Sequence, residues 1–493
     1  MIQSKSSLAS TGIEGLDQIL GGGLPTGHLY LVEGDPGTGK TTMALQFLLA
    51  GVAAGETCLY ISLSESKEEL AVAAESHGWS IDGFKVVELH PPPSETLSPD
   101  EHFTLFHASE IELADVLKNV LDEVERTQPS RIIFDSLSEM RILASDPMRY
   151  RRQILALKQF FNGRSCTALM LEDKTWDAAI SPHQLHSLSH GVILLDQITM
   201  NYGAKRRRLS VAKLRGVDFT TGYHDFAMRR GGIVVFPRLV AGEHDETFTD
   251  EVVSSGVAGF DALLGGGLDR GTTSLIIGAA GTGKTSICLR FACTLANKGE
   301  KTAMYTFDEG KKTLLDRADR LGMGARKHVQ EGLIDVRQID PAEIAPGEFI
   351  HMVRTAVKDG ATAVVVDSLN GYLNAMPQER YLVTQMHELF SFLNNMGVLS
   401  FLVVSQTGLL GHGVETPIDV SYLADTVVLL RYFENNGEVC NAISVVKKRS
   451  GEHERTIRQF LLRGNQLQVG EPITEFVGIL SGNPQYLGKG HHI

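Results

Sequence analysis

Two glycine-rich segments of the chain have the residue types and the spacing of phosphate-binding loops. Each follows the pattern G-x-x-x-x-G-K-T, and the second begins 244 residues after the first. Glycines let the backbone curl so that its N–H groups point at phosphate oxygens, the lysine reaches the β- and γ-phosphates, and the next hydroxyl binds Mg²⁺. The predicted nucleotide-binding residues are Gly34, Gly37, Thr38, Gly39, Lys40, Thr41 and Thr42 in the first loop and Gly278, Gly281, Thr282, Gly283, Lys284, Thr285 and Ser286 in the second.

A carboxylate downstream of each loop is expected to complete a metal site. Asp135 and Asp367 each end an apolar run, and each precedes Ser-Leu. A carboxylate at a strand tip can hold Mg²⁺ together with the loop hydroxyl, here Thr41 or Thr285. A lone aspartate at such a place is ordinarily a helix cap or a turn residue. The same arrangement in both halves of the chain favours the metal site.

Hydrolysis of a nucleotide also needs a group that orients or deprotonates water. The second predicted strand of each half ends in two residues that include at least one acid. They are Ser64-Glu65 in the first half and Asp308-Glu309 in the second. These ends lie at the carboxyl edge of the predicted sheet, near a bound γ-phosphate. We predict that Glu65 and Glu309 are catalytic and that Asp308 assists, whereas Ser64 has no basic group. The alternative is that the carboxylates cap the following helices.

A basic pair recurs on a predicted strand near the end of each half. Lys213 and Arg215 correspond to Lys447 and Arg449. Alternate residues of a strand point to the same side, so each pair could clamp a phosphate as an arginine finger does. A solvated strand face is the alternative. Because each pair lies far along the chain from its own loop, we expect it to reach the nucleotide of a neighbouring subunit, which requires a closed ring.

The length and the net charge of the chain indicate a globular protein of more than one domain that does not bind polyanions broadly. Its 493 residues are too many for a single core. The net charge of −13 argues against broad binding to nucleic acid or anionic membranes. The basic run 205–208 is interpreted as a solvated hairpin or an interface. Residues 1–10 lack the apolar core of a signal peptide, and no apolar run approaches about 18 residues, so we expect a cytoplasmic protein without a membrane span.

The duplication extends beyond the two loops. The motif G-(I/V)-x-G-(L/F)-D, followed by GGGL, begins at Gly12 and again at Gly256. A repeat of this size indicates two homologous domains rather than a solenoid. We predict a first domain over residues 1–245 and a second over 246–493, divided within an acidic, turn-prone stretch.

Short apolar segments alternate with helical patterns in each half. In the first half the predicted strands are 28–33, 57–63, 131–135, 165–171, 191–195 and 232–236, and the predicted helices are 41–53 and 110–126. A hairpin is expected around residues 201–203, and residues 364–367 are the carboxylate strand of the second half. This alternation predicts an α/β fold in which each domain has a mostly parallel, twisted sheet flanked by helices. Ligands then bind beyond the carboxyl ends of the strands, where both loops fall.

Taken together, these motifs resemble the KaiC family, the two-domain RecA-like ATPases of the bacterial circadian clock and its relatives. The resemblance rests on the tandem G-(I/V)-x-G-(L/F)-D and GGGL elements, the P-loops, the Asp-Ser-Leu strand ends and the K-x-R strands, and it covers about Thr11–Pro484. It implies two tandem RecA-like P-loop NTPase domains in a double-ring homo-hexamer, with ATP and Mg²⁺ at subunit interfaces. It also implies an ATPase in the first domain and a Ser/Thr autokinase and autophosphatase in the second.

The catalytic and phospho-acceptor positions of the family are only partly kept. The paired catalytic glutamates of the family align with residues 64–65 and 308–309, and only the second glutamate of each pair is present. The adjacent phospho-acceptors align with Ser421-Tyr422. We therefore expect a single phosphorylation site at Ser421, with Thr416 and Thr426 as nearby candidates, in place of an ordered two-site cycle. The alternative is that Ser421 is an ordinary polar residue near the start of a strand.

The partners implied by the resemblance differ from those of a full oscillator. The chain ends nine residues after Pro484, where clock members carry a longer tail that binds a stimulatory partner. This argues against a KaiA-like partner and favours a KaiB-like or other signalling protein. We expect a role in signalling or stress.

Two other classes of function are weighed against the ATPase and autokinase. An ATP-gated binding scaffold with very slow hydrolysis is favoured slightly by Ser64, which replaces one catalytic acid. A DNA-acting motor is compatible with a RecA-like fold, but the acidic balance, the duplication and the lack of a zinc-ribbon cysteine set argue against it.

Overall fold

The computed structural model describes residues 7–89, 117–144, 147–161, 164–174, 183–200, 202–374, 381–406, 421–463 and 466–487. The chain divides into two compact units, Met1–Arg238 and Leu239–Ile493. The division comes before the acidic stretch and before the predicted boundary at residue 245. Leu239 and Ala241 are buried in a core cluster of the second unit, and the backbone N–H of Ala241 donates to Glu388 of that unit.

The first unit is built on a nine-stranded sheet of order β11-β10-β9-β8-β3-β7-β6-β4-β5. The strands from β8 to β5 run parallel, and β9, β10 and β11 continue the sheet as antiparallel strands. The bounds are β3 Leu29–Gly34, β4 Cys58–Ser62, β5 Lys85–Glu88, β6 Arg131–Asp135, β7 Thr167–Asp173, β8 Gly191–Ile198, β9 Arg206–Leu214, β10 His224–Arg229 and β11 Gly232–Phe236.

The second unit repeats this sheet strand for strand. Its order is β16-β15-β17-β18-β14-β19-β20-β21-β22, again parallel from β16 to β19 and antiparallel beyond. The bounds are β14 Thr273–Gly278, β15 Lys301–Thr306, β16 Ile334–Gln338, β17 Ala361–Asp367, β18 Leu399–Ser405, β19 Thr426–Asn435, β20 Glu438–Lys448, β21 Arg458–Arg463 and β22 Gln466–Pro472.

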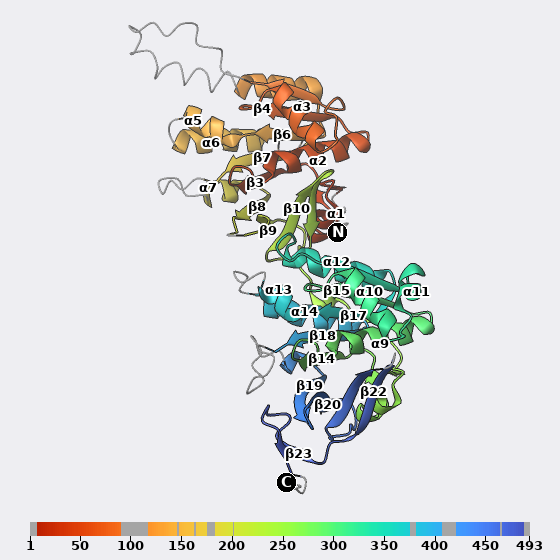
Figure 1. The fold of residues 1–493 in the computed structure, drawn as a ribbon. Helices are drawn as coiled ribbons and strands as arrows, with labels where there is room; N and C mark the ends of the chain where they lie inside the picture. The colour runs from red at the N-terminus through yellow and green to blue at the C-terminus, as the bar shows by residue number, and fades with distance from the viewer. Residues whose placement is uncertain are drawn as a thin grey trace. The chain divides into compact units, whose positions relative to one another are not determined.

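Helices cover both faces of each sheet (Figure 1). Those of the first unit are α1 Glu14–Ile19, α2 Lys40–Ala53, α3 Lys67–Ser76, the helical residues 117–127, α5 Leu137–Ala144, α6 Pro147–Phe161 and α7 His183–Leu188. Those of the second unit are α8 Ala258–Leu263, α9 Lys284–Asn297, α10 Lys311–Arg320, α11 Ala325–Gln330, α12 Pro346–Lys358, α13 Leu369–Asn374 and α14 Leu382–Asn395, with the 3₁₀ helices η1 Ala241–Glu243 and η2 Ser421–Leu423. The described part of the chain also contains three two-stranded ribbons: β1 Leu8–Ala9 with β2 Leu24–Pro25, β12 Val252–Val253 with β13 Leu268–Asp269, and β23 Phe476–Val477 with β24 Gln485–Tyr486.

The strands are continuous apolar runs because each sheet is buried on both faces. In β6, Ile133 belongs to the core cluster on the α2 side, whereas Ile132 and Phe134 belong to the cluster on the α6 side. In β17, Val365 and Val364 divide between the two faces of the second sheet in the same way. This two-sided burial is the reason why alternation of apolar and polar residues is missing from the central strands. The predicted fold, two tandem RecA-like α/β domains, is confirmed.

Several predicted elements coincide with the structure, and two differ where the site is built. The strands predicted over 131–135 and 232–236 have the bounds of β6 and β11. The strand predicted over 165–171 instead begins at Thr167 and continues to Asp173, because the buried Glu172 is paired with Arg141 and stays in the sheet. The predicted hairpin joins β8 to β9, and β8 extends to Ile198.

Candidate functional site

Both predicted phosphate-binding loops connect a central strand to a long helix. The first leads from the end of β3 into α2, and the second leads from the end of β14 into α9. The last glycine before each lysine is in the left-handed region, Gly39 with φ 107° and Gly283 with φ 98°. Gly37 and Gly281 also have positive φ. Since L-residues rarely adopt this conformation, the sequence needs glycine at these points for the loop to curl.

The two loop lysines fold back over their own loops. Lys40 Nζ donates to the carbonyl of Gly34 at 2.8 Å, and Lys284 Nζ donates to the carbonyl of Gly278 at 2.9 Å. Both side chains are buried, and burial lowers the pKa of Lys284, although the carboxylate of Asp367 opposes that shift. The predicted ligands Thr38, Thr42, Thr282 and Ser286 are also buried, and the hydroxyls of Thr38 and Thr282 donate to loop carbonyls.

In each unit the predicted metal ligands come together. Thr41 Oγ1 donates to Asp135 Oδ2 at 3.3 Å, and Thr285 Oγ1 donates to Asp367 Oδ2 at 2.5 Å. The strands β6 and β17 bring the carboxylates to the start of α2 and α9, although 94 and 82 residues separate the partners. Clustered oxygen donors of this kind are the ligands that Mg²⁺ prefers. The residues present therefore fit a Mg²⁺-nucleotide site in both units.

The two predicted catalytic glutamates have different surroundings. Burial, followed by the nearby carboxylates of Asp135 and Glu69, raises the pKa of Glu65. Glu309 instead forms an ion pair with Arg317 of α10, with 2.8 Å between Oε2 and Nη2. The predicted helper Asp308 accepts a hydrogen bond from Ser368 Oγ at 2.6 Å. In the first unit the position that corresponds to Asp308 is the exposed Ser64.

The basic pairs lie toward the amino ends of the parallel strands, whereas the loop of the same unit follows their carboxyl ends. Lys213 is paired in register with Val192, at the start of β8, and Lys447 with Val427, at the start of β19. Because β8 and β19 run parallel to the loop strands, each loop begins three residues further along these strands, about 10 Å from the level of the lysine. The pairs therefore do not contact the loop of their own unit.

The K-x-R pairs, which we call the clamps, were predicted to lie on strands, and this holds only for their lysines. Lys213 and Lys447 are on strands, but Arg215 and Arg449 come just after the last strand residue. Both lysines donate to backbone carbonyls, Lys213 to that of His186 at 2.5 Å and Lys447 to that of Ala424 at 2.8 Å.

The predicted phosphorylation site is next to the second clamp. Ser421 begins η2, and its side chain lies outside the part of the chain that the structure describes, as does all of Thr416. Arg449 donates to the carbonyl of the following residue, Tyr422, at 3.2 Å and to Asp425 at 3.3 Å. Thr426, the other nearby candidate, is 1 % exposed, so its hydroxyl is closed off from solvent.

Two residues near the first loop were not predicted from the sequence. Tyr60 of β4 donates to Asp135 Oδ2 at 2.5 Å, and Asp173 at the end of β7 is ion-paired with Lys40 at 2.7 Å. Tyr60 resembles any buried strand residue, and Asp173 was expected after the end of its strand. The one feature of the sequence that could have indicated Tyr60 and Asp173 is that each lies near the end of a predicted strand. That feature points to the loop only once the order of the strands in the sheet is known.

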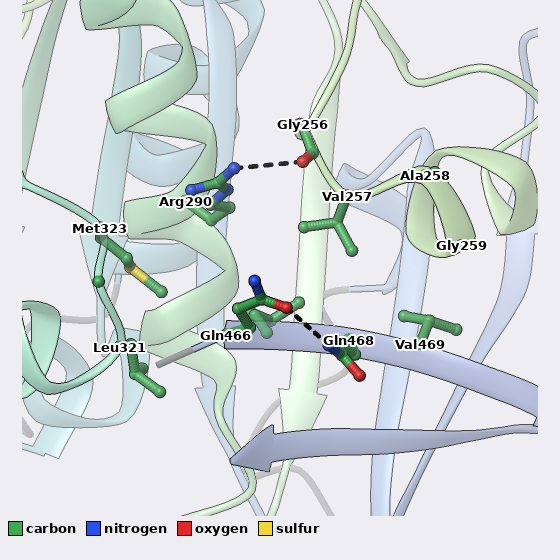
Figure 2. A pocket seen from close by; sticks show the side chains of 12 residues that line it. Gly256, Val257, Ala258, Gly259, Arg290, Leu321, Met323, Gln466, Gln468 and Val469 are labelled. Atoms are coloured by element: carbon green, nitrogen blue, oxygen red, sulfur yellow. Dashed lines mark hydrogen bonds between the residues drawn. The ribbon is translucent and has the colours of Figure 1, made fainter. Parts of the chain in front are cut away.

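A pocket of about 510 Å³ in the second unit is separate from the loop (Figure 2). Figure 2 shows Arg290 hydrogen-bonded to the carbonyl of Gly256 at its rim, with Gln466 and Gln468 from β22 on another side. Met323 also contributes to the lining. No residue of the loop lines this pocket.

In the first unit, side chains occupy the position that corresponds to this pocket. Gln46, which corresponds to Arg290, exchanges two hydrogen bonds with the backbone of Ile233. A Cβ atom added at Gly232 would be 2.6 Å from both Gln46 and Trp79. The pocket is thus a difference between the copies and not part of the predicted nucleotide site.

Comparisons with known proteins agree with this geometry. A family model described as "ATPase: KaiC" matches residues 9–240 and 253–473. The chain is 27% identical over 488 residues to the circadian clock protein KaiC3 of Synechocystis sp., covering 97% of this chain and 95% of that protein. It is 28% identical over 487 residues to the circadian clock oscillator protein KaiC of Prochlorococcus marinus (96% and 93% covered) and 26% identical over 484 residues to that of Thermostichus vulcanus (96% and 91% covered).

Among the residues that the structure describes, none of the helices has both the length and the apolar character needed to cross a bilayer. The family model covers most of the chain, in two repeats that correspond to the two units with their matching sheets, loops and carboxylates. The chain therefore belongs to the KaiC family of ATPases.

Proposed function

We propose that the protein is a Mg²⁺-dependent ATPase that works as a hexameric ring in the cytoplasm, with Ser/Thr autokinase activity in its second domain. The observation that carries the proposal is the opposed arrangement within each unit, where the loop, threonine, aspartate and glutamate gather at one sheet edge and the K-x-R pair lies at the other. In a head-to-tail ring the clamp of one subunit meets the loop of the next, so that each site is completed by a neighbour.

Hydrolysis in the first domain requires proton transfer from the attacking water. The water oxygen bonds to the γ-phosphorus, the bond to the β,γ-bridging oxygen breaks, and Glu65 accepts the proton. Lys40 holds the terminal phosphates, while Lys213 and Arg215 of the neighbour stabilise the charge that develops on them. Thr41 and Asp135 would hold Mg²⁺, which neutralises phosphate charge when bound.

The autokinase follows the same scheme with a serine hydroxyl in place of water. Ser421 begins the helix whose next residue, Tyr422, is hydrogen-bonded to the clamp residue Arg449. If Arg449 contacts the neighbour's γ-phosphate, the segment that contains Ser421 therefore lies close to the same phosphate. The Ser421 oxygen would bond to the γ-phosphorus, ADP would leave, and Glu309 would accept the hydroxyl proton.

The intact mass of the purified protein after incubation with Mg·ATP tests the autokinase, with peptide mapping of any gain. We expect one phosphate on Ser421, lost in Ser421→Ala and Glu309→Gln. Glu65→Gln is the matched control, because it removes the corresponding base of the other domain and should leave the phosphate in place. A phosphate that maps elsewhere, or that persists in Glu309→Gln, would contradict the assignment.

An ATP-gated scaffold with very slow hydrolysis is the second candidate. It is supported by the exposed Ser64, which stands where the second domain has Asp308. This candidate predicts no gain in mass, slow release of ADP and a partner affinity that depends on bound ATP. We propose a KaiB-like or other signalling protein as this partner, in timing or stress signalling. The relatives named as circadian clock proteins support the timing role.

A further inference from the structure

The two loop lysines differ in what the neighbouring strand presents to them. In the first unit, Gly34 is paired in register with Asp173, the last residue of β7. In the second unit, Gly278 is paired with Ser405, the last residue of β18. The two units thus have a carboxylate and a hydroxyl at the same point of the sheet, directly beside the loop.

The carboxylate of Asp173 is held in place from two sides. Its Oδ1 is 2.7 Å from Lys40 Nζ. Its Oδ2 accepts a hydrogen bond from Ser138 Oγ at 3.3 Å, and the same hydroxyl accepts from the backbone N–H of Asp173 at 3.1 Å. In the second unit Asn370 has the place of Ser138 and forms hydrogen bonds with the backbone of Ser405, at 2.8 and 2.9 Å.

Lys40 is the residue that reaches the β- and γ-phosphates in a loop of this type. A carboxylate within ion-pair distance of its ammonium group shares that positive charge with the phosphates. It also repels the terminal phosphate, because like charges a few ångströms apart disfavour each other strongly where water is partly excluded. Lys284 has no such carboxylate from the adjacent strand, since Ser405 is uncharged.

We propose that Asp173 is a specificity-determining residue that lowers the preference of the first domain for ATP over ADP, relative to the second domain. The γ-phosphate of ATP would add negative charge at Lys40, the group that Asp173 contacts. The penalty therefore falls more on the triphosphate than on the diphosphate. Asp196 of β8, whose counterpart in the second unit is Arg431, is ion-paired with Lys174, so the difference between the units rests on Asp173. The inference rests on the proposed ATP binding at both loops.

A reciprocal exchange in the full chain tests this inference. Lys284→Ala with Thr285→Ala confines nucleotide binding to the first domain, and Lys40→Ala with Thr41→Ala confines it to the second. Titration calorimetry with Mg²⁺ and either a slowly hydrolysed ATP analogue or ADP then gives the ratio of the two affinities. We expect Asp173→Ser to raise the preference for the ATP analogue about tenfold in the first domain and Ser405→Asp to lower it by a similar factor in the second.

Asp173→Asn keeps the shape of the side chain and should behave as Asp173→Ser does, and thermal unfolding confirms that each variant is folded. An unchanged ratio in both exchanges would overturn the inference while leaving ATP binding intact. A weaker affinity for the ATP analogue in Asp173→Asn would also overturn it, because Asp173 would then support the triphosphate. Loss of all nucleotide binding in both parent proteins would overturn the proposed function, and the inference with it.

Discussion

At the scale of single residues, the two sites use the same groups in different electrostatic settings. The carboxylate of Asp135 is buried, and burial raises its pKa, although the hydrogen bonds from Tyr60 and Thr41 act in the opposite direction. Burial likewise raises the pKa of Asp367, opposed by its hydrogen bond from Thr285. Because a metal ligand must be ionised, these hydroxyl donors matter for keeping the carboxylates charged.

The pH dependence of hydrolysis in the first domain follows from Glu65. A base must be ionised to accept a proton, and a raised pKa means that Glu65 takes up a proton at a higher pH than an ordinary glutamate. In a Lys284→Ala protein, ATP turnover should therefore fall on acidification with a midpoint above the usual value of 4.5. Glu69→Gln removes one of the carboxylates that raise this pKa and should move the midpoint to lower pH, as measured by turnover against pH. A midpoint that Glu69→Gln leaves in place would contradict this role.

The hydroxyl of Tyr60 should stabilise the first unit. Tyr60→Phe removes a donor to the buried carboxylate of Asp135, and hydrogen bonds to charged groups contribute about 2 kcal/mol. We expect the free energy of unfolding to fall by about that amount in urea denaturation. Both tryptophans of the chain, Trp79 and Trp176, belong to the first unit, so tryptophan fluorescence follows this unit alone.

Tyr30→Phe is the control for the loss of a hydroxyl. Tyr30 is equally buried and donates to the neutral carbonyl of Pro25, so its removal should cost about 1 kcal/mol. Equal losses in the two variants would mean that the charge of Asp135 adds nothing to the bond from Tyr60.

At the scale of elements, each loop is a junction in which a strand, a helix start and the neighbouring strand tips must all be in place. The sheet order puts the loop strand between two parallel neighbours in each unit, so the carboxylates of other strands arrive at the same edge. The antiparallel strands that follow pack close to the loop. Phe460 and Leu462 of β21 are near Gly283, and Met228 and Ile233 are near Gly39.

Alanine at the last loop glycine should therefore cost more in the second unit than in the first. A Cβ atom at Gly283 would be 2.8 Å from Phe460 and Leu462, whereas at Gly39 the nearest atoms are 3.3 Å away. Both substitutions strain the backbone by about 1–2 kcal/mol, and Gly283→Ala adds overpacking of about 1–3 kcal/mol. Urea denaturation followed by circular dichroism measures the difference.

The control is Gly299→Ala, which has φ 83° and open space around the added Cβ atom. It should show the cost of the backbone strain without the contacts. If Gly283→Ala were no more destabilising than Gly299→Ala, the contacts with β21 would not limit this position.

At the scale of the whole molecule, the proposed hydrolysis requires a site that two neighbouring subunits share. The clamp residues of each unit lie toward the opposite end of the parallel strands from their own loop. A nucleotide bound to a monomer would therefore have no contact with a clamp. The same geometry predicts that a missing clamp in one subunit can be supplied by another subunit.

Mixed rings test this sharing. In a Lys284→Ala background, Lys40→Ala removes the loop lysine and Arg215→Ala removes part of the clamp, so each protein alone should hydrolyse little ATP. Rings formed by co-expression should recover activity, since about a quarter of the interfaces join an intact loop to an intact clamp. No recovery, despite mixed rings verified by native mass spectrometry, would indicate that the clamp acts elsewhere.

The sequence by itself determined the fold class, the duplication and the loops, because these depend on local patterns. Glycines that need a positive φ, a lysine at fixed spacing and continuous apolar runs are legible along the chain. Asp135 and Asp367 could also be predicted, since a charge that ends an apolar strand is a local signal repeated in both halves. The bounds of β7 were less accessible, because burial of Glu172 depends on its partner Arg141, 31 residues away.

Only the tertiary structure decided which residues of different strands meet. The order of the strands makes Asp173 and Ser405 neighbours of the two loops, and it brings the hydroxyl of Tyr60 to Asp135. It also places each K-x-R pair toward the amino ends of the parallel strands, whereas the loop of the same unit follows their carboxyl ends. These differences arise from pairings between distant segments, whose electrostatic effects act through space over a few ångströms and leave no periodicity in the sequence.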